Sequence, residues 1–98
     1  METSDVSNKY FIYVLFSLKD KKLYIGYTAN IKNRLKEHIS GKVLSTKSRR
    51  PFKLIYFEYF TNIYDAKARE KYLKSGFGRS QLKLALKTTL KNLNYKHQ

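Results

Sequence analysis

The sequence predicts an α+β domain in which helices flank a small, mostly antiparallel sheet of three strands, in the order β-β-α-β-α-α. Three runs rich in aromatic and β-branched residues predict the strands, and the segments after them repeat apolar residues at helical spacing. The chain has 98 residues, which leaves room for one hydrophobic core. We therefore expect a single domain over residues 1–98, with residues 1–8 and 94–98 frayed.

The first two strands are expected at Lys9–Leu18 and Leu23–Thr28. Apolar and aromatic residues occupy both faces of the first run, which is typical of a strand at the centre of its sheet. A short charged segment separates the two runs and predicts the turn of an antiparallel hairpin. The alternation along this hairpin places Tyr13, Tyr24 and Gly26 on one face.

A helix is expected at Ile31–Ser40, where apolar residues recur at every fourth position. Asn30 precedes it as a good N-cap, and Gly41 is its natural end. The segment 42–51 is rich in lysine and arginine, contains hydroxyl residues and ends at a proline. We expect this segment to be an exposed basic loop.

The third strand is expected at Phe52–Phe60, and its mixed apolar pattern indicates a strand covered on both faces. Asn62 can cap a second helix, which should end at Gly76. Ser80 can cap a third helix whose apolar stripe continues to Leu93.

The net charge is +14, from 21 Lys and Arg against 7 Asp and Glu. The excess basic side chains would repel one another unless a polyanionic partner balanced their charge. Nucleic acid is the leading candidate for that partner. The basic residues expected to contact backbone phosphates are Lys42, Lys47, Arg49, Arg50, Lys53, Lys67, Lys71, Lys74 and Arg79. Such contacts supply affinity that depends on salt and carry little sequence preference.

Composition also excludes several kinds of site. Cysteine is absent, which excludes disulfides, thiol catalysis and zinc sites built on cysteine. Only His38 and His97 are present, so a metal ion would sit on carboxylate and water oxygens, which suit Mg²⁺ or Mn²⁺. No segment approaches the roughly 20 apolar residues that span a membrane, and no signal region opens the chain. We expect a cytoplasmic protein without a membrane partner.

Two triplets on the first two strands resemble the signature of the GIY-YIG nuclease superfamily. Tyr24-Ile25-Gly26 matches the second half letter for letter, and Phe11-Ile12-Tyr13 matches the first half with phenylalanine in place of glycine. Aromatic residues are tolerated at that position in the small stand-alone members, which this chain is most similar to. The resemblance covers roughly residues 9 to 85.

Thr28, Arg34 and His38 resemble the next part of the family's motif. Residues four apart on a helix share one face, so Arg34 and His38 can point together toward the strands that carry the tyrosines. The resemblance implies that Glu70 binds one divalent cation, Mg²⁺ or Mn²⁺. It also implies that a tyrosine, Tyr13 or Tyr24, acts as the base, without indicating which.

The remaining roles follow from phosphodiester chemistry. The guanidinium of Arg34 can pair with the scissile phosphate, and His38 can relay or accept a proton. Gly26 lets phosphate or a side chain approach the sheet closely, and Thr28 can donate a hydrogen bond nearby.

We therefore expect a divalent-metal-dependent endonuclease that acts on nucleic acid, with DNA favoured over RNA and DNA repair as a candidate process. A catalytically silent nucleic-acid-binding module of the same fold is the alternative. A basic protein of the membrane surface fits less well, because the helices are short and packed. Strand preference and oligomeric state stay open.

Overall fold

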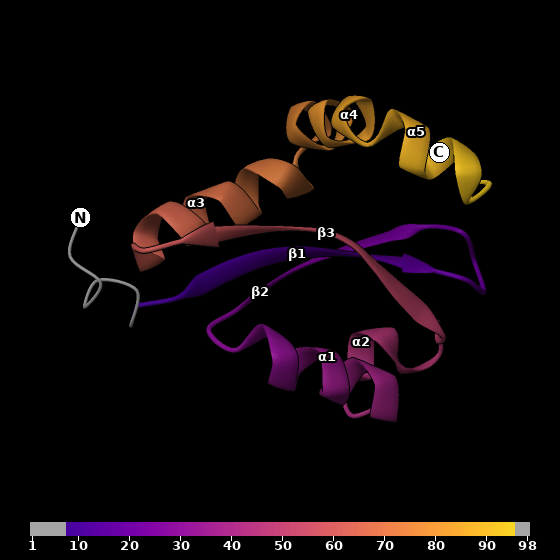
Figure 1. Cartoon of the computed structure of the whole chain (residues 1–98), viewed down its shortest axis with the longest axis horizontal. Coiled ribbons are helices and arrows are strands. Elements are labelled where there is room, and N and C mark those ends of the chain that lie inside the picture. Colours follow the sequence, from indigo (N-terminus) through magenta and orange to yellow (C-terminus); the bar gives the residue numbers. More distant parts are fainter. Residues whose placement is uncertain (1–7, 96–98) are drawn as a thin grey trace.

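The computed structural model describes residues 8–95 and confirms the predicted α+β fold (Figure 1). Strands β1 (Tyr10–Ser17), β2 (Leu23–Thr28) and β3 (Phe52–Phe60) form an antiparallel sheet in the order β2-β1-β3. The helices are α1 (Ile31–Ser40), α2 (Leu44–Lys47), α3 (Ile63–Lys74), α4 (Gly76–Ala85) and α5 (Lys87–Asn92). Helices α1 and α2 lie on one side of the sheet, and α3, α4 and α5 lie on the other (Figure 1).

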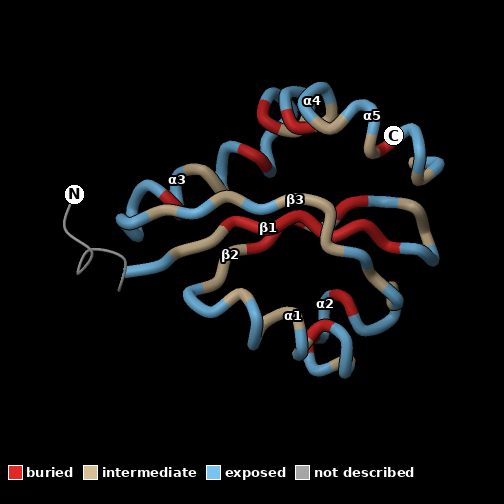
Figure 2. The backbone as a smooth tube through the Cα atoms, in the orientation of Figure 1, coloured by how far each residue is buried: buried red, intermediate tan, exposed pale blue. Residues whose placement is uncertain are grey.

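The main hydrophobic core fills the space between the sheet and helices α3 to α5. Strand β1 is central, as predicted, and Ile12, Val14 and Phe16 are completely buried on this face. The other buried members of this core are Leu23, Ile25, Ala66, Leu73, Leu82 and Leu90. Buried backbone therefore follows β1 and the inner sides of α3 and α4 (Figure 2).

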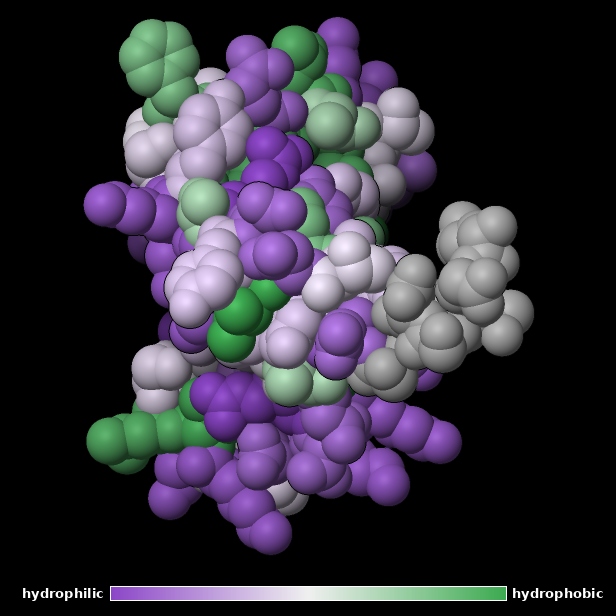
Figure 3. All heavy atoms as spheres, turned by 90° about the vertical axis from the view of Figure 1, so that its left-hand side faces the viewer, coloured by the Kyte–Doolittle hydropathy of each residue, from purple (hydrophilic) through white to green (hydrophobic). Residues whose placement is uncertain are grey.

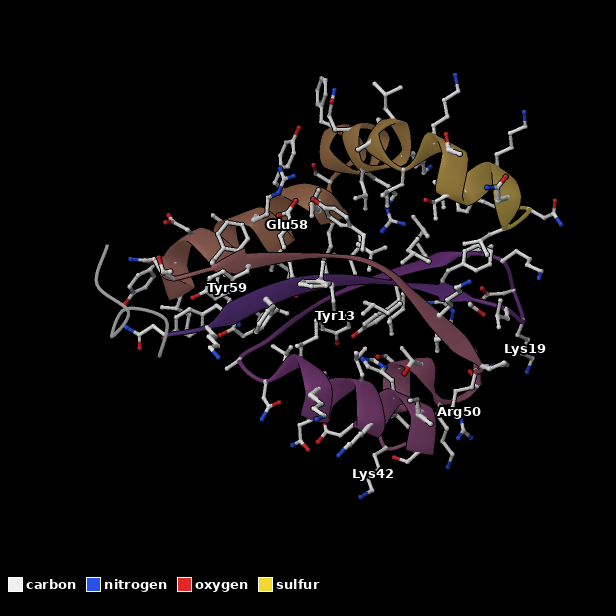
Figure 4. All side chains as sticks on the ribbon, in the orientation of Figure 1. Tyr13, Lys19, Lys42, Arg50, Glu58 and Tyr59 are labelled. Atoms are coloured by element: carbon white, nitrogen blue, oxygen red, sulfur yellow. The ribbon has the colours of Figure 1, made fainter. Side chains whose placement is uncertain are left out.

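The opposite face of the hairpin carries the tyrosines. Tyr13 pairs with Gly26, and Leu15 pairs with Tyr24. Because side chains alternate along a strand, Tyr13, Tyr24 and Gly26 share the face that looks toward α1, as the sequence predicted. Tyr13 lies between the sheet and α1 in Figure 4, whereas Glu58 lies on the α3 side.

The predicted helix caps around α1 and α3 are also present. The side chain of Asn30 accepts a hydrogen bond from the backbone N–H of Asn33 at 3.0 Å. Gly41 follows α1 with φ +78°, a left-handed conformation that favours glycine. The side chain of Asn62 accepts from the backbone N–H of Tyr64 at 2.8 Å, which fixes the start of α3.

Strand β3 is less covered than its sequence predicted. None of its residues is fully buried, and Phe57 and Tyr59 are 51% and 42% exposed. It is an edge strand, and α1 extends only about 15 Å because it has ten residues. The end of β3 that carries these two aromatics consequently has no helix over its α1-side face (Figure 1).

The basic segment 42–51 is largely exposed, as predicted, but it is not an irregular loop. It contains α2, and the side chains of Val43 and Thr46 are buried. Arg49 forms an ion pair with Asp20 at 2.6 Å. The guanidinium of Arg50 donates to two backbone carbonyls, at 3.0 and 3.2 Å. The segment is ordered because its polar groups have internal partners.

The predicted C-terminal helix is two helices with an earlier start. Ser75, and not Ser80, provides the N-cap, because its hydroxyl accepts from the backbone N–H of Gly78 at 3.2 Å. Gly76 therefore begins α4 and does not end α3 as predicted, since Ser75 is the C-cap of α3. The break at Leu86 separates α4 from α5. Close packing at Gly78, which abuts the backbone of α3, is the physical reason for this tight junction.

The ends predicted to be frayed lie mainly outside the described residues. Tyr95 is described, and its side chain packs against the main core. Within residues 8–95, no helix is both long enough and apolar enough to cross a membrane.

The junction of α3 and α4 gives a stability prediction. A Cβ atom added at Gly78 would collide with the backbone carbonyl of Tyr72, whereas one added at Gly76 would meet no atom within 4 Å. We expect Gly78→Ala to lower the free energy of unfolding by about 1–3 kcal/mol, the usual range for overpacking. Gly76→Ala is the matched control and should change it by less than about 1 kcal/mol. Urea denaturation of both variants measures the difference, and equal effects would contradict this packing.

Candidate functional site

A buried hydrogen bond joins the first sheet tyrosine to helix α1. Tyr13 is 0% exposed, and its hydroxyl lies 2.8 Å from Nε2 of His38. The two rings meet edge to face, with centroids 5.5 Å apart. Tyr13 reaches this position because its ring lies over Gly26, where an added Cβ would collide with the ring and hydroxyl of Tyr13. The absence of a side chain at Gly26 therefore positions Tyr13.

The other ring nitrogen of His38 contacts the segment after α1. Nδ1 lies 2.8 Å from Oγ1 of Thr46, and that hydroxyl donates to the backbone carbonyl of Val43 at 3.4 Å. We assign the Thr46 proton to the carbonyl of Val43, so that the Thr46 oxygen accepts from an N–H at Nδ1. Nε2 is then unprotonated and accepts from the hydroxyl of Tyr13. The hydrogen bonds thus run in one direction, from Tyr13 through His38 and Thr46 to Val43.

The ionisation of the buried pair agrees with this direction. Burial lowers the pKa of His38 below its usual range, and the positive charge of Arg34 lowers it further. Burial raises the pKa of Tyr13 to about 12, although Arg34 opposes this increase. Both groups are therefore neutral near pH 7.

Tyr24 occupies the more accessible position beside this buried pair. It is half-buried, and its ring centroid lies 5.3 Å from that of His38 and 6.2 Å from that of Tyr13. Strand β2 is at the edge of the sheet, so Tyr24 lies closer to solvent than Tyr13 does. Of the two tyrosines, Tyr24 is the one that an incoming phosphate or water can reach.

Arg34 lies one helical turn before His38 on α1. Its guanidinium pairs with Glu37 at 3.0 Å, and about a third of its side chain is exposed. The charge of Arg34 influences the pKa values of both Tyr13 and His38. The structure therefore brings Tyr13, Tyr24, Arg34 and His38 together on the α1 side of the sheet.

Thr28 has a local structural contact. Its hydroxyl accepts from the backbone N–H of Asn30 at 3.1 Å and donates to the carbonyl of the same residue at 3.2 Å. These bonds fix the turn that leads from β2 into α1 and so set the direction of the helix that carries Arg34.

Glu70 lies on α3, on the other side of the sheet. Its carboxylate pairs with Lys74 at 2.9 Å, and 21% of its side chain is exposed. Tyr27 on β2 lies near it: burial raises the pKa of Tyr27, and the charges of Tyr10 and Glu70 add to the increase. The ammonium of Lys67 lies 4.0 Å from the centre of the Tyr27 ring. The exposed edge of β2 thus separates this group from the group around Tyr24.

The donor set allows one kind of metal site. Within residues 8–95, no three His, Asp or Glu side chains are grouped so that they could hold a metal ion. The carboxylate of Glu70 is a suitable oxygen ligand for Mg²⁺ or Mn²⁺, and it is partly open to solvent. Glu70 therefore fits an ion whose other ligands are water and substrate phosphate, and not a site built from protein alone.

All nine predicted phosphate contacts are exposed or half-buried. Four of them contact protein groups: Arg49, Arg50, Lys67 and Lys74. The other five are Lys42, Lys47, Lys53, Lys71 and Arg79. Lys42 and Arg50 lie near α1 and α2 in Figure 4, and hydrophilic side chains cover much of the face in Figure 3.

Sequence reasoning missed two residues of the site. Tyr27 is the unspecified residue between Gly26 and Thr28, so the motif itself directs attention to its position. Thr46 gave no signal, because the pairing of a hydroxyl with His38 depends on how the segment after α1 folds back.

Comparison with known proteins agrees with this geometry. Residues 9–83 match the family described as the GIY-YIG catalytic domain. A UPF0213 protein of Clostridium perfringens is 37% identical over 90% of this chain and 95% of its own length. A UPF0213 protein of Pediococcus pentosaceus is 40% identical over 91% of this chain and 94% of its own length.

A solved structure is similar as well. The solution NMR structure of a UPF0213 protein from Bacillus halodurans has a TM-score of 0.50 and 34% identity, and the match covers 81% of this chain and 85% of that one. The family match spans most of the residues that carry the sheet, α1 and α3. The chain therefore belongs to the GIY-YIG catalytic domain family and is a relative of the UPF0213 proteins.

Proposed function

We propose that the protein is a divalent-metal-dependent endonuclease that hydrolyses phosphodiester bonds in nucleic acid, with DNA preferred to RNA. Membership of the GIY-YIG catalytic domain family supports a nuclease-type activity. The observation that carries the proposal is the directed chain from Tyr13 through His38 to Thr46, placed beneath Tyr24. The same chain holds α1 against the sheet and so places the guanidinium of Arg34 near the accessible ring of Tyr24, which supplies a phosphate ligand beside a proton acceptor.

The scissile phosphate binds at the edge of β2 in this proposal, between Arg34 on one side and Glu70 on the other. The guanidinium of Arg34 is planar and presents several donors, which suits two phosphate oxygens better than an ammonium does. Its present partner, Glu37, is about 40% exposed, so this ion pair costs little to exchange for a phosphate. Arg34 then stabilises the charge that develops on phosphorus oxygens during the reaction.

The chemical step requires a water oxygen to attack phosphorus while the bond from phosphorus to the leaving oxygen breaks. Tyr24 is the tyrosine placed to accept a proton from that water, because it is accessible and Tyr13 is not. The acceptor in this step is the phenolate of Tyr24, which becomes the neutral phenol as the water oxygen bonds to phosphorus. Tyr13 holds the ring of His38 in place, and His38 packs against the ring of Tyr24.

The carboxylate of Glu70 would hold a divalent cation, which would supply neutralisation of charge at the phosphate and the leaving oxygen. Because Glu70 would be the single protein ligand, we expect affinity for the cation without substrate to be weak. Lys74 must release Glu70 for this purpose, and the pair is partly open to solvent.

The first prediction about the proposed function concerns Glu70 and Arg34. We expect Glu70→Gln and Arg34→Lys each to reduce metal-dependent cleavage by about 100-fold or more, because each removes transition-state stabilisation. Asp65→Asn is the matched control, since Asp65 is an exposed carboxylate on the same helix as Glu70. Cleavage of labelled single-stranded, duplex and branched DNA, and of RNA, is measured in Mg²⁺, in Mn²⁺ and in chelator.

The outcomes separate the two functions. Cleavage that needs the cation and fails in both variants supports the nuclease. Tight binding with no cleavage of any substrate would instead identify a catalytically silent binding module.

The second prediction distinguishes the two tyrosines. Tyr24→Phe should reduce cleavage by about 100-fold and change the free energy of unfolding by less than about 0.5 kcal/mol, as is usual for accessible sites. Tyr13→Phe should lower the free energy of unfolding by about 1–3 kcal/mol, because Nε2 of His38 would lose its buried donor. Thermal denaturation and single-turnover cleavage of both variants provide the comparison. The reverse pattern would show that Tyr13 is the tyrosine that contacts substrate.

A further inference from the structure

Three aromatic side chains form a continuous surface beside Tyr13, on the α1 side of the sheet. In the sheet register Phe57 pairs with Tyr13, and Tyr59 pairs with Phe11. All of these residues occupy the same face, because each lies an even number of positions from its neighbour along the strand. The ring centroid of Phe11 lies 6.0 Å from that of Phe57 and 5.6 Å from that of Tyr59. We call Phe11, Phe57 and Tyr59 the aromatic platform.

The aromatic platform is open to solvent, although it lies on the face of the sheet that α1 covers at Tyr13. Phe57 is 51% exposed and Tyr59 is 42% exposed, whereas Tyr13 beside Phe57 is completely buried. The hydroxyl of Tyr59 donates to the backbone carbonyl of Asn8 at 3.4 Å, which restrains the ring. A restrained and contiguous group of exposed aromatics is characteristic of a binding surface and not of scattered surface residues.

The charges around the aromatic platform indicate what kind of partner it receives. The neighbouring carboxylate of Glu58 points to the α3 side and is held by Arg69 at 2.9 Å. Glu58 therefore does not present a free negative charge to the aromatic platform, and the net charge of +14 of the whole chain favours a polyanionic partner. A partner that combines flat apolar groups with negative charge is a nucleic acid whose bases are unpaired.

We propose that the aromatic platform stacks unpaired bases of a single-stranded nucleic acid and so selects single strands or splayed ends. Bases in a duplex are stacked on one another and cannot lie flat on a sheet, whereas unpaired bases stack readily on exposed aromatic rings. This inference rests on the proposed function, because the aromatic platform would hold the strand on the same side of the sheet as Tyr24 and Arg34. Base stacking then fixes which phosphate enters the site.

The experiment separates base contacts from phosphate contacts. Binding is measured in chelator, so that no cleavage occurs, by fluorescence anisotropy with a labelled oligothymidylate, a duplex and an abasic oligonucleotide of equal length. The variants are Phe57→Ala, Phe57→Trp and the control Phe77→Ala, which removes an exposed aromatic side chain on α4. Thermal denaturation verifies that every variant is folded, and cleavage in Mg²⁺ is measured separately.

We expect Phe57→Ala to weaken binding of oligothymidylate by about tenfold, the scale of one lost base–aromatic stack, and to leave the abasic strand unchanged. Phe57→Trp should retain the affinity, and Phe77→Ala should have no effect. Equal loss on both oligonucleotides, or duplex bound as tightly as single strand, would overturn the inference. So would self-association that depends on Phe57 without any change in oligonucleotide binding, which would make the aromatic platform a contact between copies of the chain.

The proposed function has a separate readout. Stacking that depends on Phe57 in a protein that cleaves none of the substrates would support the inference while contradicting the nuclease. Cleavage in Mg²⁺, together with oligonucleotide binding that Phe57→Ala leaves unchanged, would contradict the inference and not the nuclease.

Discussion

The buried hydrogen bonds of His38 are the constraint on which the α1 side of the molecule depends. Nε2 and Nδ1 contact hydroxyls on β1 and α2, each at 2.8 Å, so the one ring of His38 on α1 joins three elements. An unpaired buried polar group costs about 1–3 kcal/mol, which means that neither hydroxyl can be lost without penalty. The ring of His38 therefore fixes how α1 and the basic segment after it sit against the sheet.

Several features of the fold follow from this constraint. Gly26 has no side chain, which leaves room for the ring of Tyr13 over β2. Helix α2 brings Thr46 within hydrogen-bond distance of His38. The same arrangement leaves Tyr24 half-buried above the imidazole and places Arg34 one turn along α1. Residues that appear structural and residues proposed to act on phosphate thus share one scaffold, and a change in the buried chain would shift both.

Much of the fold is predictable from local patterns, because strand alternation and cap residues act over a few positions. The limits of β2, α1 and β3 coincide with the predicted ones, and Asn30 and Asn62 cap as expected. The errors concern tertiary contacts. Coverage of β3 depends on the length of a helix elsewhere in the chain, and the start of α4 depends on the close approach of Gly78 to α3.

In the candidate site, too, the features set by local spacing were predictable and those set by tertiary contacts were not. Spacing along the chain was enough to place the two tyrosines on one face and His38 on the helix beside them. It did not reveal which tyrosine is accessible, since that depends on Tyr13 being central and Tyr24 being at the sheet edge. Nor did it reveal Thr46, whose contact with His38 is made by a fold of the chain that has no periodic signal.

The most direct test of this account is the protonation state of His38, measured by long-range ¹H–¹⁵N NMR with the signals of His97 removed by His97→Gln. We expect a neutral ring at pH 7 with the proton on Nδ1, as the bond to Thr46 requires. The ring should stay neutral as the pH falls past about 6.5, where an unperturbed histidine gains its charge, because burial lowers its pKa. A proton on Nε2, or a charged ring at pH 7, would contradict the directed chain and with it the proposed arrangement of the site.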